Sequence, residues 1–219
     1  MKTTVLAALA ATLLGAPVHA ATFSFAGNFT QDDDVQRFDF SVGSLSTITL
    51  RSYSYAGGTQ ADGTVVSAGS FDPILALFDA TSGALIGQQD DAEDDGNVVP
   101  EDPTTEYRFD VLLDIELDAG SYFVTVMQYD NLANGPLFSD GFDRDGEGNF
   151  TGLIFPCTNG IFCDFGSNDR TSAWNFDILN VETATQEPNV PPVPLPASGL
   201  LLAGALAGIG ALRRRASRI

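Results

Sequence analysis

Apolar and polar residues alternate with a period of two along much of this chain. The alternation is strict in residues 37–42, where Phe38, Phe40 and Val42 share one face, and it returns in residues 46–55. Such a pattern is typical of β-strands that bury one side of a sheet. No segment between residues 22 and 182 shows a sustained 3.6-residue apolar stripe. The pattern therefore predicts an all-β fold.

The middle of the chain predicts a hairpin and a central strand. Residues 74–78 and 84–89 are short strands joined by a turn in which Gly83 supplies a positive φ. Residues 107–117 are also expected to be extended. The segment 121–129 is rich in Tyr, Phe, Val and Thr and is apolar on both faces, which places it at the centre of its sheet.

A last strand at residues 173–181 puts Trp174, Phe176 and Ile178 on one face. Together, eight or so short strands separated by turn signals predict an antiparallel β-sandwich of jelly-roll type. The body of the protein is expected to comprise residues 21–182.

Three segments break the strand pattern. Residues 56–70 are rich in Gly, Ser and Thr and predict a loop, and residues 90–102 form an acidic loop. Residues 130–172 are a long loop insertion rich in Gly, Asn and Asp. A loop of this length is usually functional, or is held by something other than a strand ladder. A disulfide and a bound cation are the expected supports.

The N-terminal residues 1–20 have the layout of a secretory signal peptide. One cationic side chain, Lys2, precedes an apolar run at residues 5–14, and small residues follow. Cleavage is expected between Ala20 and Ala21. A buried core helix is the alternative, but it explains neither the charge nor the cleavage pattern.

The C-terminal residues 193–219 predict a membrane segment behind a short linker at 183–192. Residues 195–212 would span ~27 Å as a helix, enough for a thin bilayer core. The arginines that follow are retained on the cytoplasmic side, so the body lies outside. An ordinary unprocessed anchor explains the apolar run and the arginines, but not the proline motif that precedes them.

Charge and composition exclude several functions. After signal cleavage the chain has neither lysine nor histidine, and five arginines stand in the body against all 29 acidic residues. This negative field makes nucleic acid an improbable partner. Without His or Lys the chain cannot build a Ser-His-Asp or Cys-His site, a Schiff base or a histidine-bound zinc. A carboxylate pair remains open by composition, but we expect no enzyme.

The two cysteines, Cys157 and Cys163, lie six positions apart in the insertion. An exported chain meets an oxidising compartment, which favours a short-loop disulfide between them. A metal site is the weaker interpretation, because two thiolates without histidine do not complete a zinc shell.

One loop of the insertion has the form of a calcium site. Asp143 and Asp145 lie two positions apart in a glycine-rich turn, a spacing that suits a hard cation. The loop lacks the terminal glutamate and flanking helices of an EF-hand. The alternative is that these acids are solvated and keep an exported protein soluble.

Residues 32–129 carry an ordered series of short motifs: DDD at 32–34, FDFSV at 38–42, TITL at 47–50, DPILALFD at 72–79, GALI at 83–86, DD at 90–91 and LDAGSYFVTV at 117–126. This series resembles the bacterial pre-peptidase C-terminal domain. The resemblance implies a non-catalytic, calcium-stabilised β-sandwich appended to secreted enzymes. It further suggests a second cation site where strand ends converge, with these ligands: Asp32, Asp34, Asp72, Asp90 and Asp91.

The insertion has no counterpart in that domain. With its SDGFDRDGEGNFTG segment and cysteine pair, it looks like a family of exported proteins of unknown function that carry the same kind of tail. The tail itself resembles the PEP-CTERM sorting signal in its VPLPA form. The residues that carry this resemblance are Val193, Pro194, Leu195, Pro196 and Ala197, the apolar segment, and Arg213, Arg214 and Arg215. Leu195 replaces the glutamate of the commonest form.

This second resemblance implies recognition by an exosortase, an integral-membrane cysteine protease. The protein would be held transiently at the inner membrane of a Gram-negative bacterium and then delivered to the surface or the extracellular matrix, in association with exopolysaccharide. The expectation is thus a non-enzymatic surface protein. The alternative is a carbohydrate-binding module in which Tyr53, Tyr55 or Trp174 stacks on sugars, although the strand pattern of Trp174 favours core packing.

Overall fold

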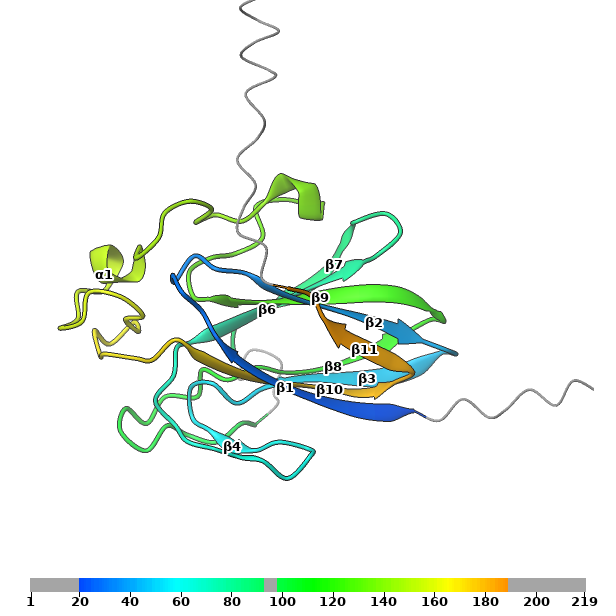
Figure 1. The fold of residues 1–219 in the computed structure, drawn as a ribbon, viewed down its shortest axis with the longest axis horizontal. Coiled ribbons are helices and arrows are strands. Elements are labelled where there is room, and N and C mark those ends of the chain that lie inside the picture. The colour runs from blue at the N-terminus through cyan, green and yellow to red at the C-terminus, as the bar shows by residue number, and fades with distance from the viewer. Residues whose placement is uncertain (1–19, 93–97, 189–219) are drawn as a thin grey trace, which may run out of the picture.

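The computed structural model describes residues 20–92 and 98–188 (Figure 1). The expected signal peptide, apart from Ala20, and the whole sorting tail lie outside the described residues. Within the described part of the chain, no helix is long and apolar enough to cross a membrane.

Two antiparallel sheets face each other and enclose the main core (Figure 1). The first sheet has the order β1 (Ala21–Asn28), β10 (Ala173–Val181), β3 (Ser46–Ser52) and β8 (Leu112–Leu117). The second has the order β11 (Thr183–Gln186), β2 (Gln36–Val42), β9 (Gly120–Gln128), β6 (Pro73–Asp79) and β7 (Leu85–Gln89). The predicted antiparallel β-sandwich is confirmed.

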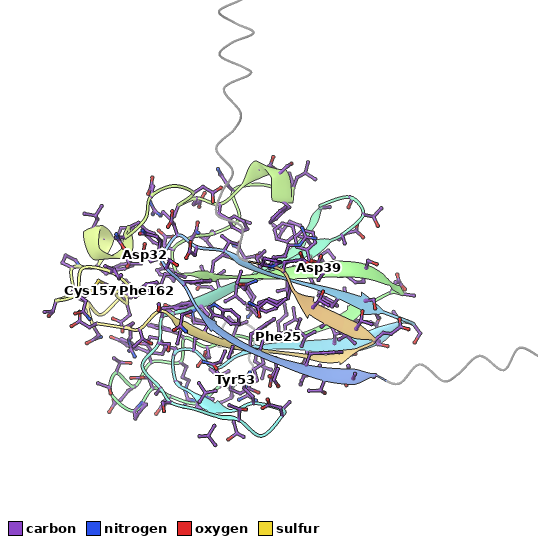
Figure 2. All side chains as sticks on the ribbon, in the orientation of Figure 1. Phe25, Asp32, Asp39, Tyr53, Cys157 and Phe162 are labelled. Atoms are coloured by element: carbon purple, nitrogen blue, oxygen red, sulfur yellow. A yellow bond between two sulfur atoms is a disulfide. The ribbon has the colours of Figure 1, made fainter. Side chains whose placement is uncertain are left out.

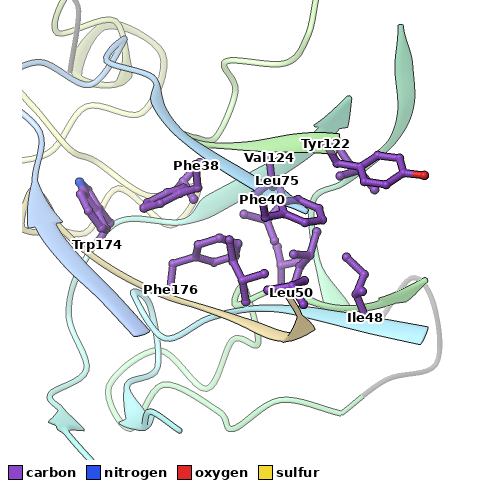
Figure 3. Packing of buried hydrophobic residues seen from close by; sticks show 14 of the residues in the cluster. Phe38, Phe40, Ile48, Leu50, Leu75, Tyr122, Val124, Trp174 and Phe176 are labelled. Atoms are coloured by element: carbon purple, nitrogen blue, oxygen red, sulfur yellow. The ribbon is translucent and has the colours of Figure 1, made fainter. Parts of the chain in front are cut away.

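The core consists of the faces that the alternating pattern marked as apolar. Phe38 is fully buried at its centre (Figure 3). Its ring centroid lies 4.8 Å from that of Phe25, 5.1 Å from that of Phe176 and 5.4 Å from that of Trp174. Aromatic contacts across the two sheets therefore hold the sandwich together.

Strand β9 is central, as its two apolar faces predict. It pairs with β2 on one side and β6 on the other. Val124 and Val126 face the main core, whereas Phe123 and Met127 belong to a second cluster on the outer face of the sheet. Residues of the insertion cover that second cluster, which explains why both faces of the strand are apolar.

The β6–β7 hairpin and strand β10 are also confirmed. Gly83 has a φ of 72°, a conformation that glycine adopts without steric cost. The segment expected to be a loop at 56–70 contains a small hairpin, β4 (Gly58–Thr59) and β5 (Val65–Val66). The strand expected at 107–117 begins only at Leu112.

The start of the expected linker belongs to the body. Residues 183–186 form β11, which pairs with β2, and Ala184 packs against the core. The Ser41 and Thr183 hydroxyl oxygens are 2.6 Å apart. The linker prediction rested on Pro, Thr and Glu content, but threonine is favourable in strands and the first proline comes only at Pro188. The folded body therefore extends beyond residue 182.

The insertion contains two short helices, η2 (Phe138–Asp140) and α1 (Thr151–Ile154), and is otherwise irregular. It lies at one end of the sandwich and over the outer face of the second sheet (Figure 1). The candidate site lies at this end.

Truncating the central aromatic should unfold the body far more easily. Replacing Phe38 by Ala removes its contacts from both sheets and should lower the free energy of unfolding by about 3–5 kcal/mol in chemical denaturation. Leu45 is 60% exposed at the other end of β2, and Leu45→Ala should change stability by less than about 0.5 kcal/mol. Equal losses in the two variants would contradict this assignment of the core.

A candidate cation site and the buried charges around it

The β6–β7 hairpin brings three carboxylates together. Asp72 directly precedes β6, and Asp90 and Asp91 directly follow β7. The antiparallel pairing sets Leu75 opposite Gln89, so the start of one strand meets the end of the other. One carboxylate oxygen from each of these three aspartates lies within 4.8 Å of the others.

Asp72 is the buried member of this acidic triad. Its side chain is 3% exposed, and its Oδ1 accepts no hydrogen bond from any residue that the structure describes. Burial, followed by the charges of Asp91 and Asp90, raises the pKa of Asp72 well above its ordinary value. A buried carboxylate without a partner is unfavourable when charged, and a cation offsets that penalty. Carboxylate oxygens are the ligands that calcium prefers, so the residues present fit a calcium ion.

The other two aspartates suggested for this site have different partners. Asp32 is fully buried and accepts hydrogen bonds from the amides of Phe150, at 3.0 Å, and Thr151, at 2.9 Å. The Thr151 hydroxyl also donates to it. Asp34 accepts from the amides of Thr30 and Gln31. The structure thus uses Asp32 to attach the insertion and Asp34 to form a turn, and neither joins the acidic triad.

Asp143 and Asp145 lie in the insertion. Asp145 accepts a hydrogen bond of 3.0 Å from the Phe142 amide, and Gly146 has a φ of 79°. Among the described residues, the acidic triad is the one group of three such ligands that the structure brings together. The glycine-rich turn at 143–149 carries Asp143, Asp145 and Glu147, but these three carboxylates do not converge as those of the acidic triad do, and Glu147 instead pairs with Arg144.

Cys157 and Cys163 form a disulfide that closes a small loop in the insertion. The Cys163 amide donates to the Thr151 hydroxyl oxygen at 3.0 Å, and that hydroxyl in turn donates to Asp32. Figure 2 shows Asp32, Cys157 and Phe162 at the same end of the molecule. These bonds connect the disulfide loop directly to the body.

A buried ion network that the sequence pattern did not reveal lies beneath the same end. The Arg170 guanidinium contacts the carboxylates of Asp164, at 2.8 Å, and Asp102, at 3.1 Å. The Tyr55 hydroxyl donates to Asp164 at 2.8 Å, and Arg170 lies 3.9 Å from the centroid of the Tyr55 ring. Each of the three charged side chains is at most 3% exposed.

The hydrogen bonds of this network decide the protonation of its acids. Burial by itself raises the pKa of Asp164, but bonds from the Asn168 amide, Tyr55 and Arg170 outweigh burial and hold the pKa below its ordinary value. The pKa of Asp102 is lowered in the same way, against its burial, by the Thr105 amide and Arg170. Both acids are therefore charged at neutral pH and paired with the arginine.

Sequence reasoning missed this network because its members come from three separate loops without periodicity. The one available signal was composition. Arg170 is one of only five arginines in an acidic body, and a rare cation in a loop is a candidate for a buried pair.

The three aromatic residues suggested for sugar stacking are buried. Tyr53 is 4% exposed, Tyr55 is fully buried and Trp174 is 1% exposed. Tyr53 donates its hydroxyl hydrogen to Asp177 at 2.9 Å. The expectation that Tyr53 or Tyr55 stacks on a sugar is therefore corrected, since neither ring offers a free face, and Trp174 packs in the core.

No protein-family model matches the chain, and a search of curated proteins finds no match.

Breaking the arginine network should destabilise the fold. Arg170→Met keeps much of the side-chain volume but leaves Asp102 and Asp164 buried without their cation, and should cost about 3–5 kcal/mol of unfolding free energy. Glu147 is 56% exposed in its ion pair with Arg144, and Glu147→Gln should cost less than about 1 kcal/mol.

The same variant should change the acid response. The pKa values of Asp102 and Asp164 are depressed in the folded state. Their contribution to the free energy of unfolding is therefore complete above their unfolded pKa near 4, and it is lost as the pH falls through their folded pKa values. Denaturant titrations from about pH 5 downward should show a smaller loss in Arg170→Met than in the wild type. An identical acid slope in both proteins would contradict the network's role.

Proposed function

We propose that the body is a non-enzymatic, calcium-stabilised scaffold with a jelly-roll topology. In support, strands β1, β10, β3 and β8 form one sheet, and β2, β9, β6 and β7 form the other. Apart from the β6–β7 hairpin, each main connection passes from one sheet to the other. This alternation is the arrangement of an eight-stranded jelly roll, with β11 added beside β2.

The observation that carries the calcium proposal is the unpaired oxygen of Asp72 inside the acidic triad. The charge balance supports it. The described buried carboxylates include Asp32, Asp72, Asp102, Asp110, Asp164 and Asp177, whereas Arg170 is the one buried basic residue in the described ranges. Hydrogen bonds and the Arg170 guanidinium compensate the charges of the other buried aspartates. A divalent cation bound by Asp72, Asp90 and Asp91 would compensate the charge of Asp72.

The non-enzymatic part of the proposal rests on composition. The mature chain has no histidine or lysine, and the buried aspartates Asp32, Asp110 and Asp177 are engaged in hydrogen bonds that fix loops. Such groups position backbone segments rather than a substrate.

We further propose that the chain is an exported protein sorted through its C-terminal segment. Support comes from the sequence, which resembles the VPLPA form of the PEP-CTERM signal at Val193–Ala197, followed by an apolar run and Arg213, Arg214 and Arg215. An exosortase would recognise the motif at the inner membrane. The body would then reach the cell surface or the exopolysaccharide matrix. The disulfide agrees with an oxidising destination.

The alternative, a carbohydrate-binding module, is less favoured. The rings proposed for it are buried, so it would need other aromatic residues. A pull-down with matrix polysaccharide distinguishes the two: specific retention of the folded body would favour the alternative.

Calcium should stabilise the body through the acidic triad. At a calcium concentration one hundred times the dissociation constant, the unfolding free energy should rise by about 2.7 kcal/mol, and a chelator should reverse the gain. Asp72→Asn removes the buried charge and should abolish most of this response in calorimetry. An unchanged melting temperature of the wild type would rule out the cation.

A matched control comes from the second acidic loop. Asp143→Asn removes one carboxylate from the glycine-rich turn and should leave the calcium response intact. If Asp143→Asn loses the calcium response and Asp72→Asn keeps it, the calcium site lies in the insertion instead of at the acidic triad.

The sorting proposal predicts removal of the C-terminal segment. In a Gram-negative host that contains an exosortase, the delivered protein should have a mass that lacks the apolar segment and the arginines. Pro194→Ala combined with Pro196→Ala should keep the full-length chain in the membrane. Delivery of wild-type protein with an intact C-terminus would instead favour a plain anchor.

A further inference from the structure

One stretch of the insertion differs in character from the rest of this acidic body. Residues 148–163 contain no charged side chain. Within and just after this stretch, apolar side chains are exposed: Leu153 is 86% exposed, Ile154 39% and Phe165 62%. Together with Phe155, these residues are called the apolar ridge below.

The apolar ridge is a connected and supported surface. The Phe155 ring stacks on Tyr129 with centroids 6.0 Å apart, and meets Phe165 edge-on at 5.8 Å. Leu153 and Ile154 lie on α1, whose first residue is held by Asp32. The disulfide closes the loop that follows α1. The exposed side chains therefore lie on a loop that is held in place by ring contacts, a hydrogen bond and a disulfide.

The apolar ridge also projects outward. Helix α1 and the loop after it lie at the outer edge of the molecule, beyond the ends of the strands (Figure 1). Sites for small molecules are usually concave. Protruding apolar side chains on a convex loop instead fit a soft apolar phase or a flat partner surface.

The chain leaves the fold at the same end. The Glu187 amide donates to the Arg37 carbonyl at 3.0 Å, and the Gln36 side-chain amide donates to the Glu187 carbonyl at 2.7 Å. The described chain therefore ends beside the start of β2. Only a short segment separates the start of β2 from Asp32, which binds α1. Leu45, at the far end of β2, marks the opposite end of the sandwich.

We propose that the apolar ridge contacts the outer surface of the lipid bilayer in which the C-terminal segment is anchored. This inference rests on the proposed membrane anchoring of residues 195–212. The eight residues between the end of β11 and that segment reach at most ~29 Å when extended, so the body is held close to the bilayer. A tether of this length gives an effective concentration on the order of millimolar, so a weak apolar contact suffices.

Charge selects the kind of lipid surface. The acidic body is repelled by anionic headgroups, whereas the segment 148–163, which contains most of the apolar ridge, carries no charge and avoids this repulsion. The contact is therefore with neutral lipid and is made by apolar side chains. It fixes the orientation of the body, with the insertion toward the membrane and Leu45 away from it.

Tryptophan quenching by brominated lipid tests the contact. The full chain is reconstituted through its C-terminal segment into phosphatidylcholine vesicles with or without brominated acyl chains. Leu153→Trp should lose roughly half of its added emission with the brominated lipid, because an interfacial side chain enters the headgroup and acyl boundary by about 5–10 Å. The native Trp174 is 1% exposed in the core and supplies a constant background.

Leu45→Trp is the matched control, and its added emission should be unaffected by bromine. Flotation of the vesicles reports the anchor separately. Flotation without quenching at position 153 overturns the ridge contact and leaves the sorting proposal intact. Equal quenching at positions 45 and 153 also overturns it. If soluble dextran changes the emission of Leu153→Trp and brominated lipid does not, the apolar ridge binds a glycan and the lipid contact is overturned. Failure to float contradicts the anchor and the ridge contact together.

Discussion

A charged carboxylate inside this protein must have a partner, and the requirement shapes most of its loops. Several buried aspartates hold loop segments in place through hydrogen bonds. Asp110 accepts from Ser52 and from the amides of Tyr55 and Ala56, which fixes the chain after β3. Asp177 accepts from Tyr53 and from the Ala61 amide, which ties the β4–β5 region to β10. Loops without a strand ladder are thus held by charge-assisted hydrogen bonds.

The insertion follows the same rule at larger scale. Asp32 accepts hydrogen bonds from the amide and hydroxyl of Thr151, the first residue of α1. The Thr151 hydroxyl oxygen in turn accepts a hydrogen bond from the Cys163 amide. On the other side, Phe138 and Phe142 cover the outer face of the second sheet. The insertion is therefore a second layer of the fold, with a polar attachment at one point and an apolar one at another. The disulfide closes only the small loop at 157–163, which follows both attachments in the chain.

The regular parts of the fold could be predicted from the sequence because they depend on local alternation. Phe38, Phe40 and Val42 reveal their strand directly, and the two apolar faces of 121–129 reveal a central one. The site could be predicted only in part. Asp72, Asp90 and Asp91 flank a recognisable hairpin, so their convergence follows from strand pairing. The hydrogen bonds of Asp32 and the Arg170 network join loops far apart in sequence, and no periodicity encodes such contacts.

The acidic triad also depends on the register of its hairpin. Leu77 pairs with Gly87 but Phe78 pairs with Leu85, so Ile86 is an extra residue on β7 and is left 40% exposed. This bulge sets Gln89 opposite Leu75 and brings the end of β7 to Asp72. A slip of one residue would turn the side chains after β7 to the other face of the sheet.

Packing beneath the insertion keeps that register. Ile74 and Phe78 on β6 are fully buried in the second cluster, and Phe138 meets Phe78 edge-on with ring centroids 5.5 Å apart. The Leu85 amide donates to the Pro136 carbonyl at 2.8 Å, so the insertion also holds the first residue of β7. Because the insertion fixes both strands of the hairpin, the geometry of the three carboxylates depends on a segment to which none of them belongs.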